Sequence, residues 1–371
     1  MADLKEKIRS LIINYKQAPA MVWRRCNAHM SYRFSNIKGH HASPPETVNF
    51  YPTDRCNLKC SMCFERLRKP RPEMQLLDWQ MIIDQIKKFR PRIHLSGGEP
   101  FLYPHIIDLI TLIKKENLFL VITTNGTLLN KHANDIVVSG VNRLHISIDG
   151  PEKIHDRIRG VPGTFKNIME GLKKIKKLRG AGYLPVIRIN SMLNLSNPAA
   201  MQEVISIACN IDANSVQFQH PLFVDKQNLT SHRFFLKKNL KLDLNYWQNA
   251  NINIAKPKDY PMASEIIRNL QNEHSTNVTV FPDISGADLK IYYSNANNFY
   301  QAYQGTCHAM WNTATILPSG DMESCPDYIV GNCQKDNFLS IWNNDTMKKL
   351  RQRIHSRYFF TVCSGCCFFY S

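Results

Sequence analysis

The sequence predicts an α/β fold, and two observations lead to that prediction. Apolar, β-rich runs alternate with helix-like stretches through residues 47–220, which is typical of repeated βα units in a parallel sheet. The chain has 371 residues, 43% hydrophobic and 21% charged. This length allows about two domains. The composition excludes a disordered or collagen-like protein.

The expected elements follow one another regularly along the chain. Six strands are expected at 47–52, 91–96, 118–124, 142–149, 184–192 and 214–220, with helices at 75–89, 105–116, 164–179 and 198–210. In such folds catalytic groups gather where the strands end. We therefore expect the functional residues in the loops that follow the strands.

The first of these loops carries three cysteines in a C-x3-C-x2-C pattern, Cys56, Cys60 and Cys63. The total of 11 cysteines is odd and no secretory signal precedes them, so metal ligation or catalysis is favoured over disulfides. Closely spaced thiolates suit an iron-sulfur cluster or zinc. A structural zinc needs a fourth Cys or His, and no nearby histidine has finger spacing. A cubane with one open iron is the better interpretation, and that iron could bind a molecule with an amine and a carboxylate.

These cysteines, together with the later run HLSGGEP, resemble the signature of the radical SAM superfamily; Met62 stands where an aromatic residue is more usual. The resemblance implies a partial (β/α)6 barrel over residues 45–225. It also implies a 4Fe-4S cluster on the three thiolates and bound S-adenosyl-L-methionine (SAM). The residues implied around the cofactor's methionine end are Met62, Gly97, Gly98, Glu99 and Pro100, with Glu99 accepting a hydrogen bond from the amino group.

Three further polar residues are implied as cofactor contacts by the same resemblance. Ser147 and Asn190, at the ends of the fourth and fifth strands, would bind the ribose or the carboxylate of SAM, and Arg159 would pair with the carboxylate. A polar residue at a strand end can equally be a turn or helix cap. We expect Thr124 and Asn125 to serve as strand-to-helix turn residues.

A second cysteine group lies near the C-terminus, at Cys307, Cys325, Cys363 and Cys366. The PSGD turn at Gly320 predicts two strands joined by a tight connection between the first two of these cysteines. The stretch resembles the SPASM and twitch extensions of radical SAM enzymes. The shorter twitch form fits because the chain ends four residues after Cys367. The resemblance implies an auxiliary 4Fe-4S cluster on the four thiolates, with zinc as the alternative.

The proposed domains are an N-terminal amphipathic extension (1–44), the barrel (45–225), a connecting region without a recognised motif (226–300) and a small SPASM/twitch-like α+β domain (301–371). The N-terminal helix would cap the barrel or lie on an anionic membrane surface. No apolar run is long enough to cross a bilayer, and no signal peptide is present. We therefore expect a cytoplasmic protein.

The net charge of +17 indicates an anionic partner. By resemblance, the chain reductively cleaves SAM and the resulting radical abstracts a substrate hydrogen, with electrons from a donor such as flavodoxin or ferredoxin. We expect dehydrogenation or epimerisation of a sugar-like or other anionic small molecule. Epimerisation would need a hydrogen donor, for which Cys209, Cys333 and Cys367 are candidates. The alternatives are a peptide-modifying maturase and, more remotely, an electron carrier or nucleic-acid-binding protein.

Overall fold

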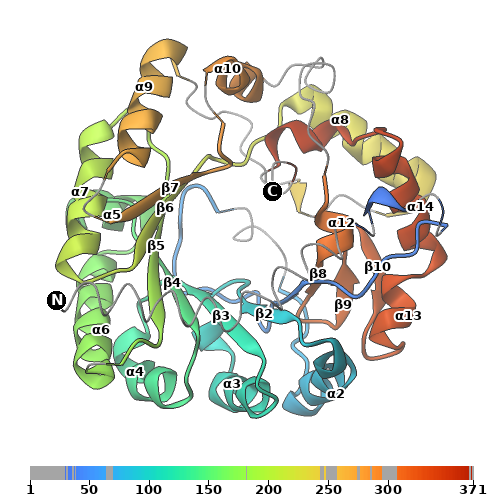
Figure 1. Cartoon of the computed structure of the whole chain (residues 1–371), viewed down its shortest axis with the longest axis horizontal. Helices are drawn as coiled ribbons and strands as arrows, with labels where there is room; N and C mark the ends of the chain where they lie inside the picture. Colours follow the sequence, from blue (N-terminus) through green and yellow to red (C-terminus); the bar gives the residue numbers. More distant parts are fainter. Residues whose placement is uncertain are drawn as a thin grey trace.

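The computed structural model of the chain describes residues 30, 32–35, 37, 39–63, 70–180, 182–242, 246–247, 257–273, 276–284, 286–294, 307–366 and 369. The expected N-terminal helix and Cys367 lie outside these residues. Within them, the chain forms one curved sheet with helices around its outer side (Figure 1).

The sheet has ten strands in the described part of the chain, in the order β10-β9-β8-β1-β2-β3-β4-β5-β6-β7. Strands β8 and β1 to β7 pair in parallel, whereas β9 and β10 are antiparallel to their neighbours. The strands are β1 (Thr47–Phe50), β2 (Arg92–Leu95), β3 (Phe119–Thr124), β4 (Arg143–Ser147), β5 (Val186–Met192), β6 (Ser215–Gln219), β7 (Asn277–Phe281), β8 (Thr313–Ile316), β9 (Asp321–Glu323) and β10 (Ile329–Asn332). The expected α/β fold with its parallel sheet is confirmed.

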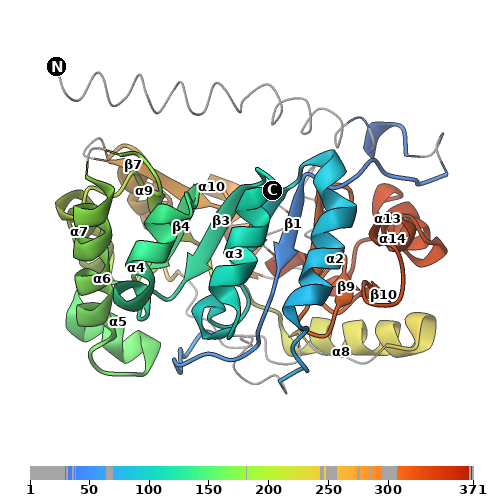
Figure 2. The same ribbon diagram turned by 90° about the horizontal axis from the view of Figure 1, so that it is seen from below.

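The helices form the outer layer, as two perpendicular views show (Figures 1 and 2). Those around the barrel are α2 (Leu76–Ile86), α3 (Ile106–Lys115), α4 (Leu129–Val138), α5 (Glu152–Arg159), α6 (Thr164–Arg179), α7 (Pro198–Asn210), α9 (Tyr260–Gln271) and α10 (Gly286–Ser294). The C-terminal part adds α12 (Ala309–Asn312), α13 (Phe338–Trp342) and α14 (Asp345–His355), and α8 (Lys226–Phe235) runs into a π-helical turn, η4 (Leu236–Leu240). Short 3-10 turns occur at η2 (Lys87–Phe89), η3 (Pro100–Leu102) and η6 (Thr361–Gly365).

Each barrel strand has one apolar and one polar face. In β5, Ile187 and Ile189 belong to the hydrophobic core shared with the helices, whereas Arg188 and Asn190 alternate with them and remain partly exposed. Parallel strands covered on both faces are usually apolar throughout. The polar inner face therefore indicates that functional side chains line the interior of this sheet.

The parallel part of the sheet is larger than the six strands that the sequence predicts. Strand β7 lies inside the region 226–300, where no motif was recognised, and pairs with β6. Strand β8 pairs in parallel with β1 at the other end. The expected connection at Gly320 is confirmed, because β8 and β9 form an antiparallel pair around it, with Gly320 at a φ of +80°. The cysteine-rich C-terminal segment thus extends the sheet of the barrel.

A buried arginine joins the C-terminal segment to the chain before β1. Arg351 on α14 is fully buried and donates to the carbonyls of Met310, His40 and Trp342 at 3.0, 3.3 and 2.8 Å. Its guanidinium lies 4.5 Å from the centre of the Trp342 ring. Burial lowers the pKa of Arg351 to about 9. The hydrogen bonds offset part of the cost of burying this charge.

We expect Arg351→Met to lower the free energy of unfolding by about 2–4 kcal/mol, because buried carbonyls lose their donors. Urea unfolding followed by circular dichroism measures this change. Lys349→Met, an exposed position on the same helix, removes the same charge as a control and should change stability by less than about 0.5 kcal/mol. Equal effects of both substitutions would contradict the role given to Arg351.

Candidate active site

The loop that carries Cys56, Cys60 and Cys63 is held on one side by the GGEP segment. Gly98 N donates to the carbonyl of Thr53 at 3.0 Å, and Glu99 N donates to that of Arg55 at 2.7 Å. A Cβ atom on Gly98 would lie 2.2 Å from the Arg55 oxygen. The sequence led us to expect that these glycines allow SAM to approach the backbone. In the structure, Gly98 packs against the backbone of the cysteine loop, and any larger residue there would collide with it.

The other side of the cysteine loop rests on the end of α5. Lys59 N and Ser61 N donate to the carbonyls of Arg159 and Ile158 at 3.0 and 3.2 Å. Gly160 follows with a φ of +73°, and a Cβ there would lie 2.6 Å from the Lys59 oxygen. Backbone hydrogen bonds therefore hold the loop from both sides.

Within this loop, Cys60 is buried, Cys63 is partly buried and Cys56 is exposed. Cys63 N donates to the carbonyl of Cys60 at 3.3 Å, which closes a turn, and Met62 lies within it. The turn brings the second and third cysteines of the motif close together.

Glu99 is the buried acid of the site, and Pro100 begins the turn η3 directly after it. Its carboxylate accepts from the Thr124 hydroxyl at 2.8 Å, from Asn125 N at 2.7 Å and from Phe101 N at 3.2 Å. Burial raises the pKa of Glu99 to about 7, although these hydrogen bonds act in the opposite direction. A carboxylate has about four acceptor positions, so Glu99 retains capacity to accept from a ligand's amino group.

Asn125 connects Glu99 to the cysteine loop, a role that sequence reasoning missed. Its side-chain nitrogen donates to Asn57 Oδ1 at 2.9 Å and lies 3.8 Å from Cys56 Sγ. Its oxygen accepts from Thr127 N at 3.0 Å. The last contact is the turn chemistry that the sequence predicts, but the first two reach across the sheet edge. The polar run TTNG at the end of β3 was the available signal.

Arg159 lies between an acid and one of the three motif cysteines. Its Nη2 is 2.7 Å from Asp149 Oδ2, and its Nη1 is 3.8 Å from Cys60 Sγ. Burial opposes the charge, but Asp149 and Cys60 outweigh it and raise the pKa of the guanidinium. Ser147 at the end of β4 is the register partner of Asn190, which lies two residues before the end of β5. The buried Asn190 Oδ1 has no hydrogen-bond partner among the described residues. The structure thus brings these two SAM-contact candidates together.

The four C-terminal cysteines Cys307, Cys325, Cys363 and Cys366 line one cavity of about 50 Å³. Burial, followed by the neighbouring thiols, raises the pKa of Cys325 well above its usual value. Gly365 packs against the backbone of Phe223, where a Cβ would lie 1.8 Å from the carbonyl oxygen. Four grouped thiols are a suitable donor set for an iron-sulfur cluster. Among the described residues, no three His, Cys, Asp or Glu side chains already stand close enough to hold a metal ion, so the ligand assignment remains a proposal.

This cavity adjoins the inner face of the barrel. Tyr51, which follows β1, and Thr313 and Thr315 of β8 also line it. Thr315 accepts a hydrogen bond of 3.0 Å from Asn49, on the inner face of β1. The four thiols are therefore next to the barrel interior.

Comparison with known proteins agrees with this geometry. Residues 50–191 match the radical SAM superfamily, and residues 307–367 match the SPASM iron-sulfur cluster-binding domain. The chain is a radical SAM enzyme with a SPASM domain. Such an enzyme uses a 4Fe-4S cluster with SAM, auxiliary iron-sulfur chemistry and a reductant.

The relatives of this radical SAM enzyme have different activities. The AdoMet-dependent heme synthase of Nitratidesulfovibrio vulgaris is 34% identical over 166 residues, which cover 43% of this chain and 44% of the relative. The PqqA peptide cyclase of Gluconobacter oxydans is 26% identical over 183 residues, or 48% and 50% of the two chains. The matches thus span at most half of these curated relatives. The structure of Streptococcus suis SuiB bound to S-adenosylmethionine shares the fold, with a TM-score of 0.64 and 18% identity over 89% of this chain and 74% of that chain.

Of the three candidate hydrogen-donor thiols, the two within the described residues lie away from the cysteine loop. Cys209 is partly buried near the end of α7, in the outer helix layer. Cys333 is buried directly after the edge strand β10, and burial raises its pKa to about 12. Cys367 lies outside the described residues.

No helix in the described part of the radical SAM enzyme is long and apolar enough to cross a membrane.

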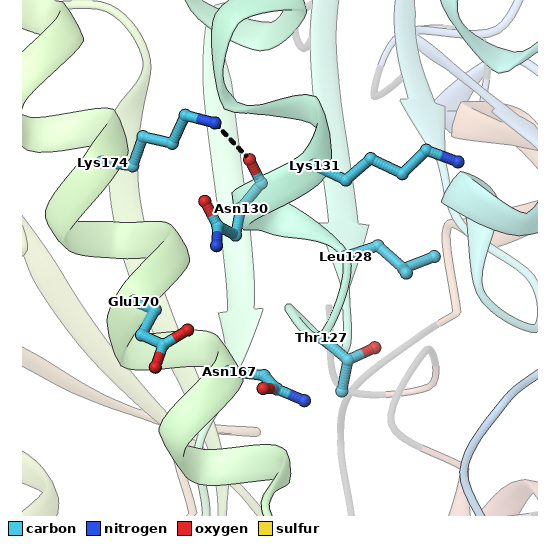
Figure 3. A pocket seen from close by; sticks show the side chains of 7 residues that line it. All are labelled: Thr127, Leu128, Asn130, Lys131, Asn167, Glu170 and Lys174. Atoms are coloured by element: carbon cyan, nitrogen blue, oxygen red, sulfur yellow. Dashed lines mark hydrogen bonds between the residues drawn. The ribbon is translucent and has the colours of Figure 1, made fainter.

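A pocket of about 420 Å³ lies beside the cysteine loop, between α4 and α6 (Figure 3). Thr127, which lines it, accepts from Asn57 of the cysteine loop at 2.8 Å. On the far side, Lys174 donates to the carbonyl of Asn130 at 2.8 Å. Because α4 and α6 belong to the outer layer, this pocket is separate from the inner face where the polar strand residues lie.

We expect Glu99→Ala to weaken SAM binding about tenfold to a hundredfold, through loss of a charge-assisted hydrogen bond worth roughly 1.5–3 kcal/mol. The pKa of Glu99 is raised to about 7, so the ionised acceptor forms above pH 7 and is lost below it. SAM affinity of the parent protein should therefore increase between pH 6 and pH 8, and that increase should vanish in Glu99→Gln. Isothermal titration calorimetry measures both, and unchanged affinity in Glu99→Ala would refute the role.

The division of thiols into three plus four predicts the iron content. Anaerobic reconstitution should give roughly eight irons and eight sulfides per chain if both sites hold cubanes. Combined replacement of Cys56, Cys60 and Cys63 by alanine should remove about half. Cys209→Ala is the matched control and should retain all of the iron. Zinc together with one cubane's worth of iron in the intact protein would rule out the auxiliary 4Fe-4S cluster.

Proposed function

We propose that this chain is a radical SAM oxidoreductase that removes hydrogen from a sugar-like or other anionic small molecule. Cys56, Cys60 and Cys63 would hold the SAM-binding cluster, and Cys307, Cys325, Cys363 and Cys366 would hold the auxiliary cluster. With these groups and SAM in place, the site supplies a 5'-deoxyadenosyl radical and an acceptor for a second electron. A flavodoxin or ferredoxin would serve as the reductant.

The observation that carries this proposal is the position of the four-thiol cavity beside the barrel interior. Tyr51 and Thr315 both line the cavity. Tyr51 directly follows β1, and Thr315 lies on the inner face of β8. A substrate bound between Ser147, Asn190 and this wall would have SAM on one side and the auxiliary site on the other. That arrangement suits loss of a hydrogen atom followed by loss of one electron and one proton.

The basic character of the inner face supports an anionic substrate. Arg143 and Arg188 lie on inward strand positions, and the whole chain carries a charge of +17. A positive interior raises the local concentration of anionic ligands.

The alternative of epimerisation receives less support, because Cys209 and Cys333 stand in the outer helix layer and at the sheet edge. A donor thiol must reach the substrate radical. Cys367 follows Cys366 in the sequence and remains a candidate donor to be tested directly.

Peptide modification is the second candidate function. The specific observation in its favour is the sequence relationship to PqqA peptide cyclase. The two candidates are separated by offering the enzyme small anionic alcohols and peptides in parallel and measuring which of them stimulates the formation of 5'-deoxyadenosine.

For the parent enzyme with SAM, dithionite and a small anionic alcohol such as a sugar phosphate, we expect 5'-deoxyadenosine and a product lighter by two hydrogens. Cys60→Ala should abolish both because the cluster is lost. Cys363→Ala with Cys366→Ala should retain some 5'-deoxyadenosine but lose the oxidised product. Mass spectrometry follows both compounds, and Cys209→Ala serves as the matched thiol control.

Running the same reaction in deuterated solvent separates the outcomes. A deuterium-free product that has lost two hydrogens supports dehydrogenation. An isomer that gains deuterium from solvent and requires Cys367 would replace the proposal by epimerisation.

A further inference from the structure

One layer of polar side chains crosses the inner face of the sheet below the SAM-contact candidates. It contains Thr315, Asn49, His94, Thr123, His145 and Arg188, on β8, β1, β2, β3, β4 and β5. The layer steps by two residues between β2 and β3, where the register partner of His94 is Val121. Asn49 accepts from His94 Nδ1 at 3.3 Å, and His94 Nε2 accepts from the Thr123 hydroxyl at 2.8 Å. The His94 and His145 rings lie 6.1 Å apart. The layer reaches from the four-thiol cavity to β5.

At the β5 end of this layer, two hydrogen-bond donors have no acceptor among the described residues. Arg188 Nη2 lies 2.9 Å from His145 Nδ1, and arginine can only donate. His145 Nδ1 is therefore the acceptor, and the proton of the neutral ring is on Nε2. Both His145 Nε2 and Arg188 Nε are buried, and neither has a hydrogen-bond partner in the part of the chain that the structure describes. His145 is only 8% exposed. A buried donor left unpaired costs roughly 1–3 kcal/mol.

The charges around these donors are positive. Burial, followed by the charges of Arg143 and Arg92, lowers the pKa of Arg188 to about 10. Burial and Arg188 also lower the pKa of His145 well below its usual value. Glu46 is 3.3 Å from Arg92 and compensates that residue, and the guanidinium of Arg143 lies 5.7 Å from the centre of the Phe119 ring. A ligand that suits this environment would therefore be a hydrogen-bond acceptor that carries negative charge.

We propose that Arg188 and His145 form an oxyanion-binding subsite that holds a carboxylate or phosphate group of the substrate. The partly exposed guanidinium of Arg188 would donate to the anion, and Arg188 Nε–H and His145 Nε2–H beside it have no other acceptor among the described residues. This subsite deepens the proposed function and rests on it for the identification of the bound group as part of the substrate.

The position of the subsite fits that use. Asn190 lies two residues beyond Arg188 on the same face of β5 and is the register partner of Ser147. Two residues of a strand span about 6.6 Å. An anionic group held at Arg188 would therefore place a carbon about five bonds away at the level of the SAM-contact candidates. A substrate whose reactive carbon lies about five bonds from its anionic group fits this spacing.

The test uses the full chain without SAM or reductant, so that it does not depend on radical chemistry. Inorganic phosphate and succinate are titrated into the parent protein, Arg188→Gln, Arg188→Lys and the control Arg268→Gln by isothermal titration calorimetry at pH 7.5. Arg268 is exposed on the outer helix α9 and gives the same change in net charge. We expect Arg188→Gln to weaken binding of the preferred anion at least tenfold, Arg188→Lys to weaken it less, and Arg268→Gln to change it less than twofold.

Each outcome of the titration either supports or overturns the subsite. Preference for phosphate or for succinate in the parent protein assigns the type of oxyanion, and each supports the subsite when Arg188→Gln abolishes that preference. Equal binding in the parent and Arg188→Gln, or no binding in the parent, overturns it. If Arg188→Gln does not fold, Arg188→Lys and the increase in melting temperature of the parent with anion concentration decide the question. A protein that binds the anion but forms no 5'-deoxyadenosine with SAM and dithionite would refute the proposed function and leave the anion site standing.

Discussion

The parallel pairing of β8 with β1 is the constraint on which the arrangement of both thiol groups depends. Phe50 at the end of β1 is the register partner of Ile316 at the end of β8, and Tyr51 N continues the ladder by donating to the Ile316 carbonyl at 2.9 Å. The loop with Cys56 leaves from β1, and the hairpin that leads to Cys325 leaves from β8. Two cysteine groups far apart in the sequence are therefore positioned by neighbouring strands of one sheet.

The second organising feature is the difference between the two faces of each barrel strand. The outer positions, such as Ile187 and Ile189, enter the helix-covered core and stabilise the barrel. The inner positions carry hydroxyls, amides, imidazoles and guanidinium groups, whose burial is unfavourable unless they find partners. Most of the inner layer is paired internally from Thr315 to Thr123, but the Arg188 end is not. The fold thus tolerates the unfavourable burial of unpaired polar groups at a place where a bound ligand would supply their hydrogen-bond partners.

The sequence was sufficient for features that depend on local spacing. The cysteine motif and GGEP each lie within a few residues, and alternating apolar runs identify the strands that helices cover. Strand β7 escaped notice because NVTVF is short and stands in a region without other signals. The pairing of β8 with β1 joins residues more than 260 positions apart, which no local pattern specifies. The roles of Asn125 and Arg188 depend on contacts with residues of other strands and loops. They could therefore be identified only once the register of the sheet was known.

The same register links the charge of the interior to the chemistry proposed there. Removing two electrons from an alcohol releases a proton. His94 is a neutral base on the inner layer, whereas the lone pair of the neutral His145 ring already accepts from Arg188. Burial and the nearby arginines lower the pKa of His94 to about 4, which makes it a poor proton acceptor in the absence of a ligand. An oxyanion beside Arg188 would oppose those positive charges and raise the pKa of both imidazoles. Anion binding would therefore prepare the interior to accept the proton that substrate oxidation releases, and the basic layer would serve both recognition and proton transfer.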